Sequence, residues 1–342
     1  MLEPLKIAGC DGWGEGYHEY VMRVFLSSSV FFKSLSLMAL ILGASGVPGW
    51  AQSSVMVVDS YNKKIHVASN ANAKRPVGGL AKMVTGMVAL DWAAASGVGV
   101  NVMAPVPAYA PQIAGLQTLD LQPGDKLTLR DLIYAAMMSS DNVAAITLGD
   151  FVGRDHLSRL GRGGDPLAEF VRQMNQLAMR EGCKNTRFTN PHGMENTRVA
   201  PHSTAADMAR LALYAAARPA MRFYTNQSSR DIAVYRGGQK LMVTVTNNNP
   251  LLGSDRIDGI KAASTPSSGG CVVVSAEKAP SVYQQADGAS VIYRHRLVVV
   301  VIGSGNPFGE ARGLLQQGWA VYDQWLNAGR PVTDARQLLS GF

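Results

Sequence analysis

The chain has 342 residues, of which 47% are hydrophobic, 17% charged and 7% aromatic. This composition excludes a disordered, a collagen-like and a disulfide-dense protein, and the length is sufficient for one large core or two modest ones. Lys and Arg outnumber Asp and Glu by 32 to 25, which gives a formal net charge of +7. Because the basic residues are scattered rather than clustered, we expect an anionic environment and no nucleic-acid partner.

The N-terminal region has the pattern of a secretory signal peptide. Residues 30–47 form an apolar run whose central stretch is too short to span a bilayer. Arg23 and Lys33 precede that stretch, small residues of a cleavage site follow it, and Met22 is well placed to start such a peptide. We therefore predict that residues 1–51 are an extension and signal peptide of a periplasmic or other envelope protein. No stable membrane anchor is expected after cleavage; a buried core helix is the alternative interpretation.

Strand and helix patterns alternate along the mature chain. A turn-rich bridge at residues 60–63 between two short strand-like runs predicts a hairpin, and the pattern becomes helical after Pro76 and ends at Gly97. The remaining predictions are strands at residues 55–58, 65–68, 232–234, 241–245, 257–261, 271–275 and 297–302, helices at 129–151, 167–180 and 205–217, and a closing helix with Leu315, Trp319, Tyr322 and Leu326 on one face.

Strands at both ends with helices between them predict an α/β (α+β) fold. We expect one antiparallel sheet that is closed by both ends of the mature chain, is flanked by helices and carries an inserted helical lobe. Residues 52–329 would form this domain, and residues 330–342 a C-terminal tail. Removal of the leader leaves Cys183 and Cys271, which we predict to be small buried residues, with a disulfide as the alternative.

Three short clusters suggest a chemical function. The first covers residues 75–82 at a helix start and ends in Gly79-Leu80-Ala81-Lys82, and the second is Ser140-Asp141-Asn142 after an apolar helical run. The third covers residues 258–265 on a strand and ends in Lys261-Ala262-Ala263-Ser264-Thr265. In this order they resemble the Ser-x-x-Lys, Ser-x-Asn and Lys-Thr-Gly elements of penicillin-binding proteins and serine β-lactamases.

The flanking segments narrow this resemblance. Residues 190–194, 202–208, 249–252 and 269–271 are similar to segments of the D-alanyl-D-alanine carboxypeptidases of the low-molecular-mass penicillin-binding group. The resemblance covers nearly the whole mature chain and implies a penicillin-binding protein/β-lactamase-like fold. We expect the family's additional C-terminal β-rich domain and amphipathic membrane anchor to be missing from this chain.

The resemblance also implies a mechanism. In the family, a serine one helical turn before a lysine attacks the D-Ala-D-Ala carbonyl after the lysine has accepted its proton. Lys82 corresponds to that lysine, and Ser140 and Asn142 correspond to the residues that relay protons and hold the substrate amide. The backbone N–H groups of Gly79 and Ser264 would form the oxyanion hole.

The implied substrate is the D-Ala-D-Ala end of a peptidoglycan stem peptide. Lys261 would attract its terminal carboxylate, and Ser264 or Thr265 would supply a substitute hydroxyl. No cofactor or metal is expected, because the histidines of the mature chain show no ligand spacing. We interpret His192 and His202 as structural residues.

The sequence departs from the family pattern at the positions that carry the chemistry. The nucleophile position is Gly79, which has no side chain, and the threonine and glycine of the third element are Ala262 and Ala263. Loss of a catalytic serine costs on the order of a millionfold in rate, or about 8 kcal/mol. Acyl-enzyme chemistry through position 79 is therefore excluded, and penicillin is not expected to acylate that position.

Three hypotheses follow from this pattern. The first is a pseudoenzyme that keeps the cleft and binds stem peptides weakly or serves as a scaffold. The second is an active carboxypeptidase that uses another nucleophile, such as Ser140, or a water activated by Lys82. The third is a structural envelope protein whose cleft binds nothing.

Overall fold

The computed structural model describes residues 52–115, 118–195, 200–284 and 289–342. The predicted extension and signal peptide lie outside these ranges. Within them, no helix combines the length and the apolar character needed to cross a membrane.

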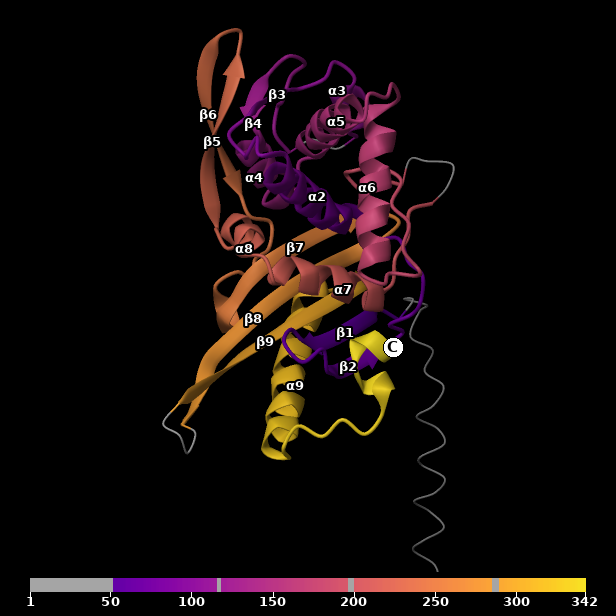
Figure 1. Cartoon of the computed structure of the whole chain (residues 1–342), viewed down its shortest axis with the longest axis vertical. Helices are drawn as coiled ribbons and strands as arrows, with labels where there is room; N and C mark the ends of the chain where they lie inside the picture. The colour runs from indigo at the N-terminus through magenta and orange to yellow at the C-terminus, as the bar shows by residue number, and fades with distance from the viewer. Residues whose placement is uncertain (1–51, 116–117, 196–199, 285–288) are drawn as a thin grey trace, which may run out of the picture. The chain divides into compact units, whose positions relative to one another are not determined.

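The central element is an antiparallel sheet that combines strands from the N-terminal and C-terminal parts of the described chain (Figure 1). Its strand order is β2-β1-β9-β8-β7, so the predicted N-terminal hairpin and the predicted closure of the sheet by the two ends are both confirmed. The strands are β1 (Ser54–Asp59), β2 (Ile65–Ser69), β7 (Ile257–Thr265), β8 (Gly269–Gln284) and β9 (Ser290–Ser304).

The helices lie mostly where the sequence predicts them, and Gly97 ends the first long one in a left-handed conformation. Residues 129–151 were expected to form one helix but form two, because Ser140 has a positive φ of 63° and Asp141 starts a new helix. The helices are α2 (Ala81–Ser96), α3 (Ala110–Ile113), α4 (Leu129–Met137), α5 (Asn142–Arg159), α6 (Pro166–Arg180), α7 (Ala205–Ala216), α8 (Pro219–Thr225) and α9 (Pro307–Asn327), with short 3-10 turns η1 (Gly78–Leu80), η2 (Ser254–Arg256), η3 (Ala335–Gln337) and η4 (Leu339–Gly341).

A second antiparallel sheet corrects the expectation of a single one. Its strands, in the order β3-β4-β5-β6, are β3 (Met103–Pro105), β4 (Lys126–Thr128), β5 (Ser229–Arg236) and β6 (Gln239–Thr246). The β5–β6 hairpin extends along the helical lobe in Figure 1, and Lys126 of β4 pairs with Tyr235 of β5. Hydrophobic alternation identifies a strand but not its partner, so the sequence did not separate this hairpin from the central sheet.

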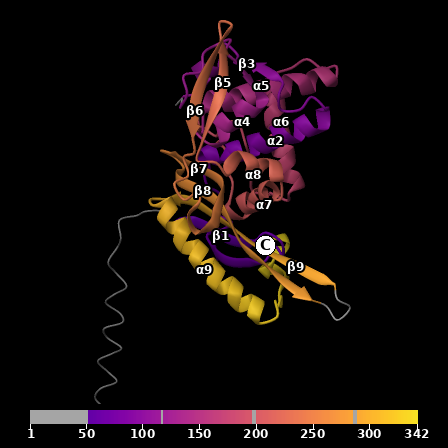
Figure 2. The same cartoon turned by 90° about the vertical axis from the view of Figure 1, so that its left-hand side faces the viewer.

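Helices cover both faces of the five-stranded sheet (Figure 2). One face contributes Val273 and Val300 to a core that also contains α2, α4, α5 and α7, and the opposite face packs against α9. Successive residues of a strand point to opposite faces. On β7, Ala262 therefore packs in the core on the α9 side, while Ala263 packs against the core of the lobe.

The C-terminal residues pack onto the domain. Leu339 is buried, its N–H donates to the carbonyl of Lys63, and its carbonyl accepts from Arg210 of α7. Cys183 and Cys271 are free and buried, as the sequence predicts, and burial raises the pKa of both thiols.

A buried arginine joins the strands next to the β7 edge. The side chain of Arg296 on β9 is 2% exposed and donates to both carboxylate oxygens of Asp258 on β7, at 2.8 and 2.9 Å. It also pairs with Glu277 of β8. Arg222 of α8 approaches the same two carboxylates, so this network connects the sheet to the lobe.

Replacing Arg296 with methionine should therefore be costly. The change leaves two carboxylates without their buried partner, and we expect a loss of about 3–5 kcal/mol in the free energy of unfolding, measured by urea denaturation. Arg294→Gln is the matched control, because Arg294 pairs with Glu277 from a 55% exposed position and should contribute less than about 1 kcal/mol. Equal urea midpoints for the two variants would contradict this interpretation.

Candidate active site

The start of α2 lies so close to the end of β7 that a side chain on Gly78 would collide with its neighbours. Gly78 has a φ of +48°, and a Cβ on it would lie 2.8 Å from Oγ of Ser268 and 2.9 Å from Cγ2 of Thr265. Glycine therefore allows η1 to approach the turn that follows β7. This close approach sets the position of Gly79 and of the first turn of α2.

Gly79 lies at the centre of the predicted site. A Cβ on this residue would lie 3.4 Å from Nζ of Lys82, 3.3 Å from Oγ of Ser140 and 3.1 Å from Cβ of Ala263. The three sequence clusters, far apart along the chain, therefore converge on the one position that has no side chain. The contact with Ala263 is tighter than an ordinary van der Waals contact, so a larger residue at position 79 requires a local shift.

Lys82 is a buried amine on the first turn of α2. It is 2% exposed, and its Nζ donates a 2.9 Å hydrogen bond to the carbonyl of His192. Burial lowers the pKa of Lys82 to about 7, against a smaller opposing effect of Asp141. No carboxylate in the described ranges forms an ion pair with it.

The segment around His192 is held close to α2 by a glycine. Gly193 has a φ of +85°, and a Cβ on it would lie 1.9 Å from the carbonyl oxygen of Gly78. His192 itself is buried, its Nδ1 accepts from the N–H of Met194, and burial lowers its pKa to about 3, with a further contribution from Lys82. These contacts agree with a structural role for the imidazole.

The second cluster forms the break between α4 and α5. Asp141 is fully buried and caps α5, because its Oδ1 accepts from the N–H of Ala144 at 2.7 Å. Its Oδ2 accepts from the N–H groups of Thr118 and Leu119. Ser140 can therefore project toward Gly79 from a fixed turn.

Asn142 is buried at the first position of α5, and its Nδ2 donates a 2.7 Å hydrogen bond to the carbonyl of Ala114. That bond ties α5 to the segment that follows α3.

Lys261 is a second buried amine, on β7. Its Nζ donates to the carbonyl of Ala262 at 2.5 Å and to Oδ1 of Asn248 at 3.4 Å. Burial lowers its pKa well below the usual value, and the charge of Lys82 lowers it further. Two amines thus lie within electrostatic reach of each other, with no carboxylate paired to either in the described part of the chain.

The two substitute hydroxyls occupy different environments. Ser264 is exposed, and strand alternation places it on the opposite face of β7 from Ala263, away from Gly79. Thr265 lies on the same face as Ala263, but its Oγ1 is hydrogen-bonded to Glu195 at 3.0 Å and to Ser268 at 2.8 Å. The structure therefore brings Lys82 and Ser140 together around Gly79, but not Ser264.

Sequence reasoning missed three contributors to this geometry. Asp141 is the helix cap that fixes the second cluster, and the Ser/Thr/Asp/Asn preference at helix starts was the available signal. The carbonyl of His192 and the amide of Asn248 are the partners of the two lysines. No sequence pattern indicates these two contacts, because they depend on backbone and loop packing.

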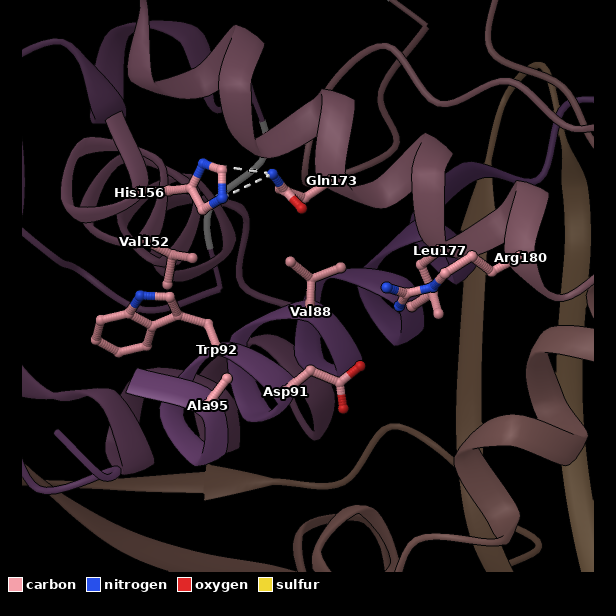
Figure 3. A pocket seen from close by; sticks show the side chains of 9 residues that line it. All are labelled: Val88, Asp91, Trp92, Ala95, Val152, His156, Gln173, Leu177 and Arg180. Carbon is pink, nitrogen blue, oxygen red and sulfur yellow. Dashed lines mark hydrogen bonds between the residues drawn. The ribbon is translucent and has the colours of Figure 1, made fainter. Parts of the chain in front are cut away.

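A separate hollow of about 230 Å³ lies between α2, α5 and α6 (Figure 3). None of the predicted site residues lines it. Its polar groups are largely paired within the protein, since His156 contacts Glu169 and Asp91 contacts Tyr214 and Arg218. The residues around it are Val88, Asp91, Trp92, Ala95, Val152, His156, Gln173, Leu177 and Arg180.

The described ranges contain no group of three or more His, Cys, Asp or Glu side chains that could hold a metal ion. What the candidate site offers is the buried amine of Lys82 and the Ser140 hydroxyl around Gly79, with the buried amine of Lys261 within electrostatic reach of Lys82. Such groups can accept or donate protons and attract an anion. Residue 79, where the family pattern has a serine, is a glycine and therefore has no side-chain oxygen.

Solved structures show which class of fold surrounds this site. The chain is similar to the Streptomyces K15 DD-transpeptidase, with a TM-score of 0.66, 22% identity and coverage of 80% of this chain and 98% of that one. It is also similar to the D-alanyl-D-alanine carboxypeptidase DacD of Francisella tularensis, with a TM-score of 0.62, 22% identity and coverage of 79% and 70%. The expected penicillin-binding protein-like fold is confirmed.

The sequence then defines the family. The D-alanyl-D-alanine carboxypeptidase profile of the S11 peptidases matches residues 44–283, and the chain belongs to this family. It is 28% identical over 332 residues to the D-alanyl-D-alanine carboxypeptidase DacD of Salmonella typhimurium, covering 92% of this chain and 76% of the relative. Over 226 residues it is 26% identical to a D-alanyl-D-alanine endopeptidase of Pseudomonas aeruginosa, covering 66% of each.

The lowered pKa of Lys82 predicts how stability depends on pH. Between about pH 7 and the ordinary lysine pKa of 10.5, the unfolded chain binds a proton that folded Lys82 does not, so the free energy of unfolding rises with pH in this window. Lys82→Met should reduce that rise, measured by urea denaturation at several pH values. The same substitution at exposed Lys126 is the control, and identical slopes in wild type and Lys82→Met would refute the assignment.

Proposed function

We propose that the chain is an envelope protein that retains the stem-peptide cleft of a D-alanyl-D-alanine carboxypeptidase but does not perform acyl transfer. The observation that carries this proposal is the convergence of Lys82, Ser140 and Ala263 on Gly79, at 3.1–3.4 Å from the place of a missing Cβ. Family membership supports the choice of ligand. The signal-peptide pattern of residues 1–51 supports export to the envelope.

The environment of Ala263 supports a loss of function that involves more than one residue. Its methyl group occupies space that a serine Cβ at position 79 would approach to 3.1 Å. A serine there would need this strand residue to shift, and glycine at position 263 would remove the conflict. The Gly79 and Ala263 departures from the family pattern are therefore sterically compatible with each other, whereas a serine at position 79 beside Ala263 requires a small local shift.

Two other functions remain distinct hypotheses. An active carboxypeptidase would need Ser140 or a Lys82-bound water as nucleophile, and the arrangement of both groups around Gly79 is the observation in its favour. A purely structural envelope protein would need no ligand at all. Hydrolysis assays distinguish an active carboxypeptidase from our proposal. Binding assays distinguish a purely structural envelope protein from it.

A restoration series tests the catalytic part of the proposal. Wild type should release no D-alanine from a peptide ending in D-Ala-D-Ala above the buffer rate. Gly79→Ser alone should remain impaired because of the Ala263 contact, whereas Gly79→Ser with Ala263→Gly should gain activity. Adding Ala262→Thr, at a side chain that packs in the core on the α9 side, completes the family's third motif and gives the triple variant.

The controls for this series are Ala263→Gly alone and the triple variant with Lys82→Met, both of which should be inactive. Release of D-alanine by wild type at an ordinary enzymatic rate, roughly 1–1000 per second, would disprove the proposal. In that case, loss of activity on Ser140→Ala would identify the alternative nucleophile.

A titration tests whether the cleft still binds stem peptide. Binding of the terminal carboxylate beside Lys261 favours the charged amine, so binding should take up a proton and weaken as the pH rises. Lys261→Met should weaken binding by about 10–100-fold, the value of a charged hydrogen bond. Calorimetry in two buffers of different ionisation enthalpy measures affinity and proton uptake together.

Exposed Lys240 on β6 provides the matched control, because Lys240→Met removes the same charge without altering the cleft. Equal affinities of the Lys261 and Lys240 variants, or no saturable binding by wild type, would favour the structural envelope protein.

A further inference from the structure

A groove of about 620 Å³ lies between α6 and the segment that leads to His192. None of the residues of the three sequence clusters lines it, so it is distinct from the candidate active site. It borders that site through His192, which lines the groove and whose carbonyl accepts the hydrogen bond from Nζ of Lys82. A ligand in the groove would therefore lie next to the site without entering it.

Two contacts give the groove its direction. At the start of α6, Leu167 and Pro191 meet, since a Cβ on Gly149 would lie 3.2 Å from Cδ2 of Leu167 and 3.1 Å from Cγ of Pro191. Further along the helix, the Asn175 amide exchanges two 2.9 Å hydrogen bonds with the backbone of Phe188. At a rise of 1.5 Å per residue, these contacts lie about 12 Å apart along the helix. The segment thus runs antiparallel to α6, and the Pro191 end is the one next to the site.

The middle of the groove is aliphatic. Ala168 and Val171 line it from neighbouring positions on α6, and Ile113 lines it from α3. Ala168 is exposed and Ile113 is 39% exposed. The groove therefore offers accessible apolar surface to the carbon atoms of a ligand.

The charges of the groove are unequally paired. Arg172 is used within the protein, because its guanidinium donates to both carboxylate oxygens of Glu169, at 2.6 and 2.8 Å. Asp165 caps α6 by accepting from the N–H of Leu167, and it is exposed and forms no ion pair in the described ranges. Arg187 is exposed beside Phe188, and its guanidinium has no hydrogen-bond or ion-pair partner among the described residues. The groove thus has a free carboxylate near the site and a free guanidinium at its far end.

We propose that this groove binds the part of a peptidoglycan stem peptide that precedes D-Ala-D-Ala. The ligand class is an extended peptide with an amine near its D-Ala-D-Ala end and a free carboxylate further from it. Asp165 pairs with the amine, Arg187 pairs with the carboxylate, and the carbon atoms between them contact Ile113 and Val171. This inference rests on the proposed function for the identity of its ligand.

The order of the two charges selects this ligand class. A peptide whose carboxyl end lies beside Lys261 enters the groove at its His192 end, so its amine meets Asp165 before its carboxylate reaches Arg187. An extended chain rises about 3.3 Å per residue, so a groove of about 12 Å holds three or four residues. A uniformly anionic ligand, such as a polyphosphate, would place negative charge against Asp165 with no cation between them.

The experiment uses the probe N-acetyl-L-Ala-γ-D-Glu-L-Lys amide, which has one carboxylate and one amine and lacks D-Ala-D-Ala. Calorimetry should show saturable binding to the whole protein. Arg187→Gln and Asp165→Asn should each weaken binding about 3–10-fold, because each removes one exposed charge pair. Asparagine is also a good helix cap, so Asp165→Asn keeps the start of α6. Arg256→Gln, at an exposed arginine outside the groove, is the matched control and should leave the affinity unchanged.

Modified probes determine which charge each residue meets. Conversion of the probe carboxylate to an amide should remove the effect of Arg187→Gln, and acetylation of its amine should remove the effect of Asp165→Asn. Ala168→Phe adds a ring to the groove at an exposed helix position and should weaken the original probe at least 10-fold. Circular dichroism checks that each variant is folded.

No saturable binding of the tripeptide by wild type would overturn the proposal, as would equal affinities of wild type, Arg187→Gln and Ala168→Phe. Failure of the proposed function gives a different result. In that case, the tripeptide and the same peptide extended by D-Ala-D-Ala would bind equally well, and Lys261→Met would weaken neither. Saturable binding of the extended peptide alone would instead overturn the groove and leave the proposed function in place.

Discussion

The candidate site depends on the close approach of the start of α2 to the end of β7. Two consecutive glycines serve different purposes there. Gly78 allows the approach, because a Cβ on it would collide with Ser268 and Thr265. Gly79 has no side chain, and atoms of Lys82, Ser140 and Ala263 lie 3.1–3.4 Å from the place of its Cβ. The three sequence clusters therefore meet at a residue that carries no side chain.

The sequence could predict the local parts of this arrangement but not the contacts between segments that are far apart along the chain. Local signals were sufficient for the N-terminal hairpin, for the end of α2 at Gly97 and for the closing helix α9, because hydrophobic period and glycine placement act over a few residues. The order of the motifs was sufficient to predict that Lys82 and Ser140 meet. The pairing of β5 with β4, which puts β5 and β6 in a separate sheet, was not predictable, since strand alternation does not identify a partner.

The same distinction applies to the contacts of the two lysines. Their place in the motifs followed from the sequence, but their protonation state depends on what surrounds them. Lys82 bonds to the carbonyl of His192, and Lys261 to a carbonyl and the side-chain amide of Asn248, so neither has an acidic partner in the described ranges. Burial without such a partner favours the neutral form of an amine. Sequence spacing does not report burial, so the low pKa values required the structure.

The same observations show what determines the state of the Lys82 amine. Its pKa is lowered by burial, so the effect does not depend on a hydroxyl at position 79. The site thus combines a buried amine with a neighbouring residue that has no side chain. A protein under selection for stability alone would gain by replacing buried Lys82 and Lys261 with apolar residues of similar volume. The proposed function gives one of them a use, because Lys261 would attract the carboxylate of a stem peptide.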